Sequence, residues 1–288
     1  MVNARYSWPA GDELSVSAFG GGAPTVAVGM LAHSNEPLGT AFASALEEYD
    51  GAYGSIALIG PIDPPPPAHR FALPCELRTF LRDGYLPPLA EQVEFAHTDR
   101  PATAAQRRAA RLREIVADLR PALLVLVHND AFSRFPYLYA NEPQPELERA
   151  LREELGREPA LAYAPLPAAG WTQRVGPLTY AYFPCDRIGV HGTESAGVFI
   201  PRQLGIPTLT VELPMFDWCA APLARSALRE AMGRWIAAGG ALADRTEMLA
   251  LAGRLLAGAA VPMLEPILAV RALDAVVRSS IRTARIPA

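Results

Sequence analysis

The sequence predicts a layered α/β/α fold, in which helices cover both faces of a mostly parallel sheet. Its strongest strand candidates are short and almost continuously apolar, which is typical of strands buried on both faces. Amphipathic helical segments alternate with them, as in a helix-covered sheet. The chain has 288 residues, half of them hydrophobic. We expect a single domain over residues 1–288, because no long linker or charge run divides the sequence.

Four segments are predicted to be the central strands. They are Thr25–Leu31, Ser55–Ile59, Ala122–Val127 and Thr208–Leu213. The expected helices are Leu38–Tyr49, Ala102–Leu119 and Glu146–Leu155, followed by a mainly helical C-terminal third (about 223–288) that breaks at Gly239-Gly240 and Pro262. Pro37 suits the start of the first helix. The regions 61–101 and 164–184 are expected to be mostly irregular, and long loops of this kind often belong to binding sites.

Composition excludes several classes of function. The net charge is −4 and no basic stripe is present, so nucleic acid is not an expected partner. The chain contains no lysine, which excludes Schiff-base chemistry and leaves arginine as the cation for binding substrate. Three cysteines without a Cys-x-x-Cys pair indicate a reducing compartment. Without a signal peptide or membrane-spanning run, a cytoplasmic protein is expected.

Chemically active side chains follow three of the predicted strands. His33 and Glu36 come directly after the first strand, His128 ends the third, and Glu212 ends the fourth. Sites in open α/β sheets form outside the carboxyl ends of the strands. If these strands are parallel neighbours, the four side chains converge at one edge.

Together these residues have the composition of a hydrolytic zinc site. Two imidazoles and one carboxylate are a common ligand set that leaves a position open for water. A further carboxylate is then needed to take the proton of the water and pass it to the leaving group. Glu212 suits that role, because a buried acid in an uncharged strand is costly without a purpose. The alternatives are a loop histidine, an ordinary helix-start acid and a strand-end acid paired with an arginine.

These motifs resemble those of a known family. His33-Ser-Asn-Glu36 after a strand resembles the His-x-x-Glu zinc motif of the zinc carboxypeptidases and of their relatives, the aspartoacylase and succinylglutamate desuccinylase deacylases. The segments 124–129, 192–195 and 205–214 resemble the family's second-histidine strand, substrate loop and catalytic-glutamate strand, and 85–95 resembles a segment of bacterial members. The resemblance covers roughly residues 24 to 216.

The resemblance implies a three-layer α/β/α fold with a mixed, mostly parallel central sheet. It also implies one zinc ion held by His33, Glu36 and His128, with Glu212 as general base and then general acid. The expected activity is hydrolysis of an amide bond in a small-molecule or peptide substrate that bears a carboxylate. An N-acyl amino acid deacylase is the alternative within the family, and a non-catalytic binding member is the alternative from another class.

The sequence departs from the family in the residues that hold the substrate. The family's Asn-Arg pair, which grips a substrate carboxylate and helps to polarise the carbonyl, has no obvious counterpart. We expect Arg70 or Arg134 to supply the cation, with Arg78 and Arg82 as other candidates.

Other polar residues are interpreted more simply. His69, His97 and His191 are expected to be loop histidines, although His191 adjoins the 192–195 segment and is a candidate for the pocket wall. Asn129 and Asp130 are candidates for orienting His128, or simply terminate its strand.

Overall fold

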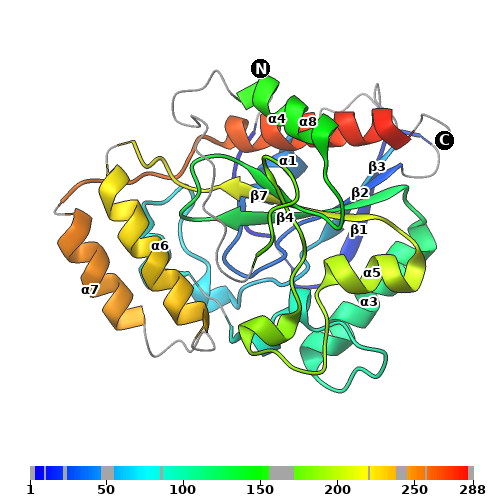
Figure 1. Cartoon of the computed structure of the whole chain (residues 1–288), viewed down its shortest axis with the longest axis horizontal. Helices are drawn as coiled ribbons and strands as arrows, with labels where there is room; N and C mark the ends of the chain where they lie inside the picture. Colours follow the sequence, from blue (N-terminus) through cyan, green and yellow to red (C-terminus); the bar gives the residue numbers. More distant parts are fainter. Residues whose placement is uncertain are drawn as a thin grey trace.

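The computed structural model describes residues 4–9, 11–21, 25–46, 55–84, 87–155, 172–219, 221–237, 245–256 and 258–284. Within them, seven strands form one sheet in the order β1-β3-β2-β4-β7-β5-β6 (Figure 1). The strands are β1 (Ser15–Phe19), β2 (Val26–Gly29), β3 (Ile56–Gly60), β4 (Leu123–Asp130), β5 (Tyr137–Tyr139), β6 (Thr179–Tyr180) and β7 (Thr208–Pro214).

The centre of the sheet is parallel and its edges are mixed. β3, β2, β4 and β7 pair in parallel. β1 is antiparallel to β3, and β5 is antiparallel to β7 but parallel to β6. The carboxyl ends of β2, β4 and β7 therefore lie at the same edge, which is where ligands bind in such sheets.

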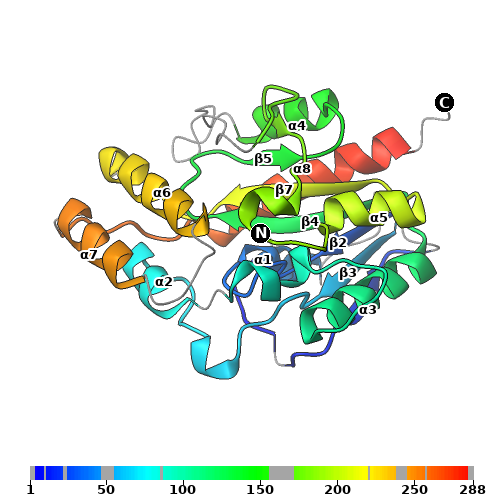
Figure 2. The same ribbon diagram turned by 60° about the horizontal axis from the view of Figure 1, so that its bottom comes forward.

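Helices cover both faces of the sheet, as expected. α1 (Leu38–Leu46), α4 (Pro145–Leu155) and α8 (Pro266–Ala284) lie on one face, and α3 (Ala104–Leu119) and α5 (Ala196–Leu204) lie on the other (Figures 1 and 2). Successive residues of β2 face opposite layers of core, because side chains alternate along a strand. Val26 and Val28 are buried with α1 and α8, and Ala27 is buried with α3.

α6 (Pro222–Ala237), α7 (Arg245–Leu256) and α2 (Leu77–Asp83) lie beyond the end of the sheet, on the left in Figure 2. Short 3₁₀ turns link the remaining segments: Pro67–His69, Leu89–Glu91, Val93–Phe95 and Cys185–Ile188. None of the described helices is long and apolar enough to span a membrane.

The structure confirms the predicted fold class and changes several boundaries. β4 and β7 run on to Asp130 and Pro214, so His128 and Glu212 lie inside strands and not at their ends. α3 begins at Ala104 and not Ala102, because Thr103 forms a capping box with Gln106.

The region 61–101 contains α2 and three 3₁₀ turns, so it is less irregular than expected. β1, β5 and β6 have no counterpart among the predicted strands. Residues 47–49 of the first expected helix, Gly239-Gly240, Tyr85 and the first part of 164–184 lie outside the described residues.

Candidate metal centre

The loop that carries His33 and Glu36 is fixed at both ends. After β2, Leu31 takes a left-handed backbone conformation (φ 53°) and turns the chain toward α1. The amide N–H of Glu36 donates to the carbonyl of His33 (3.2 Å). The side-chain oxygen of Asn129 accepts from the amide N–H of Leu38 (2.9 Å), which caps α1 and ties its first residue to β4. The loop is therefore held against the strand that carries His128.

His33, Glu36 and His128 form a buried cluster. One potential ligand atom from each lies within 4.8 Å of the other two. Nδ1 of His128 lies 3.3 Å from Oε2 of Glu36, and the two imidazole rings are 4.6 Å apart. Nδ1 of His33 and Oε2 of Glu36 are buried and have no hydrogen-bond partner. Because buried polar atoms are normally satisfied, these orphaned atoms fit a bound cation.

The protonation states of the cluster also suit a metal. Burial lowers the pKa of His33 to about 4 and that of His128 to about 3. Both imidazoles are therefore neutral at pH 7, which is the form that binds a metal. Burial raises the pKa of Glu36 to about 7, and His33 and hydrogen bonding oppose the rise. A divalent cation would favour the ionised carboxylate.

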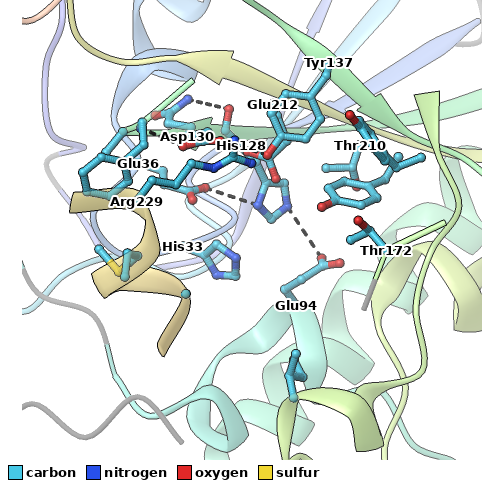
Figure 3. Close-up of a pocket in the computed structure, with 18 of the residues that line it drawn as sticks. His33, Glu36, Glu94, His128, Asp130, Tyr137, Thr172, Thr210, Glu212 and Arg229 are labelled. Carbon is cyan, nitrogen blue, oxygen red and sulfur yellow. Dashed lines mark hydrogen bonds and ion pairs between the residues drawn. The ribbon is translucent and has the colours of Figure 1, made fainter. Parts of the chain in front are cut away.

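Glu212 lies beside this cluster, as the sequence suggested. It pairs in register with His128 across the parallel β4–β7 ladder and opposes Tyr137 of β5. Its side chain is half-buried and lines the same cavity as the cluster (Figure 3). Burial, followed by the charges of Glu36, Asp130 and Glu94, raises the pKa of Glu212 well above its usual value. A carboxyl group with a raised pKa is suited to holding and releasing a proton near neutral pH.

A cavity of about 600 Å³ opens over these residues. This is within the size range of small-molecule sites. One wall consists of aromatic rings from β5, β6 and the segment after β6: Tyr137, Tyr139, Tyr180, Tyr182 and Phe183. The opposite wall includes residues of α6. The cavity therefore has room for a small substrate beside the cluster.

Glu94 is a site residue that sequence reasoning missed. It lies in the 3₁₀ turn Val93–Phe95, lines the cavity and is 6% exposed. One of its carboxylate oxygens is 3.9 Å from Nε2 of His128, on the side of the ring opposite Glu36 (Figure 3). Burial, followed by Glu36, raises its pKa to about 8. The segment 85–95 resembled a family segment, but no motif in it marked this glutamate.

The expected substrate arginines do not line the cavity. Arg70 binds Asp12 (2.5 Å) and the carbonyl of Pro9 (3.0 Å), so its guanidinium is already satisfied. Arg134 is half-buried outside the cavity lining. Arg78 and Arg82 are exposed. Neither Arg70 nor Arg134 lines the cavity, and their assignment to the substrate stays a prediction.

Two arginines of α6 line the cavity instead. Arg225 and Arg229 are one helical turn apart, and Arg229 extends from α6 into the cavity toward Glu212 and Tyr137 (Figure 3). Burial, followed by the like charges of Arg134 and Arg229, lowers the pKa of Arg225. The charge of Arg229 partly offsets the raised pKa of Tyr137. An arginine-bearing helix is common on protein surfaces, so the sequence offered no signal for this role.

The remaining polar residues have structural roles. Asn129 caps α1, and Asp130 accepts hydrogen bonds from the amides of Phe132 and Ser133 and from the hydroxyl of Tyr137. His69 and His191 are exposed, and His97 is buried outside the cavity lining.

We compared the chain with known proteins. No family model matches it, and no curated protein matches it. Among solved structures, it is similar to a protein of Shewanella denitrificans OS217 that is described provisionally as a metallopeptidase (12% identity, 88% of this chain and 85% of that chain, TM-score 0.49). It is also similar to a metallo-carboxypeptidase from Burkholderia cenocepacia (13%, 70% and 56%, 0.40). A third is an aspartoacylase family protein from Mesorhizobium loti MAFF303099 (13%, 78% and 61%, 0.40).

The resemblance in the sequence is to the same groups of proteins. The residues of the site, and not these overall similarities, support the function proposed below.

Proposed function

We propose that the chain is a zinc-dependent hydrolase of an amide bond. The observation that carries the proposal is the buried His33, Glu36 and His128 cluster, whose orphaned atoms lie beside the carboxyl group of Glu212. Two neutral imidazoles and one carboxylate are a ligand set of catalytic zinc sites, and this set leaves a position open for water or substrate. When bound, zinc would lower the pKa of a water molecule and polarise a carbonyl oxygen.

The residues around the metal site would supply proton transfer, charge stabilisation and an apolar surrounding. The carboxylate of Glu212 takes a proton from the attacking water and delivers it to the leaving nitrogen. Arg229 presents a guanidinium to the cavity, where it stabilises negative charge on the substrate or on the oxyanion. The aromatic wall excludes water from the reacting groups.

The experiment measures metal content and turnover together. Protein purified with zinc available is expected to carry about one zinc per chain, and to release amine from a panel of dipeptides and N-acyl amino acids. Glu212→Gln is expected to retain the zinc and to lose about 10²–10⁴-fold in turnover. Glu230→Gln is a matched control, because Glu230 is an exposed glutamate of the same cavity lining. Wild-type protein without stoichiometric metal would contradict the proposal.

A further inference from the structure

The two ends of the cavity carry side chains of opposite charge type, the carboxyl group of Glu94 and the guanidinium of Arg229. Glu94 lies on the side of the 3₁₀ turn Val93–Phe95, and Arg229 lies on the side of α6, with the metal cluster between them (Figure 3). Their electrostatic effects fall on different residues of the aromatic wall. Glu94 raises the pKa of Tyr182, whereas Arg229 acts on Tyr137 and Tyr139. The cavity is therefore polar along its length.

No arginine that the structure describes forms an ion pair with Glu94 at the other end. Within the part of the chain that the structure describes, the only ion-pair contact of Glu94 is the 3.9 Å approach to His128, whose imidazole is neutral. Leu89, Phe95 and Phe183, which line the same cavity, belong to one apolar cluster. A positive group in the cavity would stabilise this carboxyl group of Glu94 in its ionised form.

Among the described residues, no acid forms an ion pair with the arginines of the positive end. Arg225 and Arg229 are like charges one turn apart, and the charge of Arg134 acts on Arg225 as well. Two acids lie near this end. Asp130 already accepts hydrogen bonds from two amides and from Tyr137, and Glu212, toward which Arg229 extends, forms no ion pair with it among the described residues (Figure 3). No ion pair of Arg225 or Arg229 occurs among the described residues. A bound anion would relieve this repulsion, and a carboxylate fits a guanidinium in a bidentate manner.

We infer that the site takes a short zwitterionic amide of the dipeptide class, whose free ammonium group binds Glu94 and whose carboxylate binds Arg229. This inference rests on the proposed function, because it places the amide bond at the cluster between the two charges. A cavity of about 600 Å³ suits a substrate of this length. Hydrolysis adds one water across the C–N bond: its hydroxyl goes to the acyl carbon, and its proton goes to the leaving amine. The products are two amino acids.

The inference separates this site from that of an N-acyl amino acid deacylase. In an N-acyl amino acid the acyl side bears no ammonium group, so nothing would neutralise Glu94. Acetylation of the free amine therefore tests the contact with Glu94 directly, because it removes the positive charge and leaves the scissile bond in place.

The test compares three compounds on the zinc-loaded protein: alanylphenylalanine, its N-acetyl derivative and its C-terminal amide. Phenylalanine is chosen because the wall of the cavity is aromatic. We expect kcat/KM for the free dipeptide to exceed that for the acetylated one by about tenfold or more. Glu94→Gln should bring this ratio close to one. The matched control, Glu91→Gln, changes an exposed glutamate three residues away and should preserve it. Arg229→Gln should reduce the preference for the carboxylate over the amide and leave the ammonium preference in place.

A second measurement does not depend on turnover. Binding of the same compounds to zinc-loaded Glu212→Gln is measured by calorimetry, with the same order of affinities expected. If none is hydrolysed but the free dipeptide binds best, the proposed function fails and the inference stands. If the acetylated compound binds or reacts as well as the free one, or if none of the three binds, the inference is overturned. The comparison of the free and the acetylated dipeptide on the wild-type protein tests the inference even if the Glu94 variant does not fold.

Discussion

Nδ1 of His128 and Oε2 of Glu36 lie 3.3 Å apart, yet the two atoms do not form a hydrogen bond. One belongs to the sheet and the other to the loop before α1. Two acceptor-bearing groups held this close in a buried site normally share a proton or a cation. The cap between Asn129 and Leu38 holds the loop to β4, so the distance is maintained by the backbone. The cap therefore keeps Glu36 close to His128.

The first prediction concerns the ligands. His33→Ala and His128→Ala should each abolish stoichiometric zinc, because removing one of three protein ligands leaves too few. His191→Ala should have no effect, since His191 is exposed and contacts Asp186. Zinc should also stabilise the wild-type chain, by about 4 kcal/mol at 1,000 times its Kd. Elemental analysis and thermal unfolding, with and without zinc, provide the measurements. Full zinc occupancy in both alanine variants would refute the assignment.

The second prediction concerns Arg229. Arg229→Gln should raise KM for carboxylate-bearing substrates by about 10–100-fold, because a charge-assisted contact is lost. Arg234→Gln is the matched control, because Arg234 lies on the same helix but is exposed and outside the cavity lining. Steady-state kinetics of both variants on one substrate provide the comparison. Equal effects of the two substitutions would show that Arg229 acts only through general electrostatics.

The third prediction concerns pH and Asp63. Burial raises the pKa of Asp63 to about 7, and Arg108 and hydrogen bonding oppose the rise. Between the unfolded value of 3.8 and the folded value of about 7, the native state holds this proton more tightly than the unfolded state does. The contribution of Asp63 to stability therefore falls as pH rises through that window.

Asp63→Asn removes the titration and keeps a side chain of similar shape. The variant should match wild type at low pH and exceed it at pH 8 by about 4 kcal/mol in unfolding free energy. Asp118→Asn, on an exposed position of α3, is the control. Denaturant unfolding at pH 5 and pH 8 measures the difference. An equal pH dependence in wild type and Asp63→Asn would contradict the prediction.

The fourth prediction concerns Gly197 in α5. A Cβ atom at this position would overlap the ring of Tyr182, which is rigid and lines the cavity. Gly197→Ala should therefore destabilise the fold by about 1–3 kcal/mol and disturb the wall beside Glu94. Gly253→Ala, in α7, meets no atom within 4 Å and should stabilise by about 0.5–1 kcal/mol. Thermal unfolding of both variants tests the contrast.

The central strands and the cluster of His33, Glu36 and His128 were predictable from sequence, because their sequence patterns are local. Each strand is an apolar run, and the ligands follow strands that the fold must place side by side. The edge strand β1 could not be predicted, because its first four residues are exposed and do not form an apolar run. β5 and β6 have three and two residues, too short for a periodic pattern.

The charged ends of the cavity were not predictable for a different reason. Arg229 and Glu94 are separated by more than a hundred residues, and each belongs to an ordinary local pattern: an arginine on a helix and an acid in a loop. Only the packing of α6 and the 3₁₀ turn around the sheet edge brings them to the same cavity. Arg70 was one of the two arginines expected to bind substrate, but its guanidinium binds Asp12 and the carbonyl of Pro9 instead.

The left-handed turn at Leu31 gives this site an unusual dependence on the hydrophobic core. A leucine adopts this backbone conformation only at some cost, and here the buried side chain, 2% exposed, holds it in place. The direction in which His33 and Glu36 leave the sheet is thus set by an apolar anchor and not by polar contacts alone. Moving His-x-x-Glu onto another strand would transfer the ligands but not the direction in which they leave the sheet. An engineered copy of this centre must therefore carry Leu31 and its packing as well.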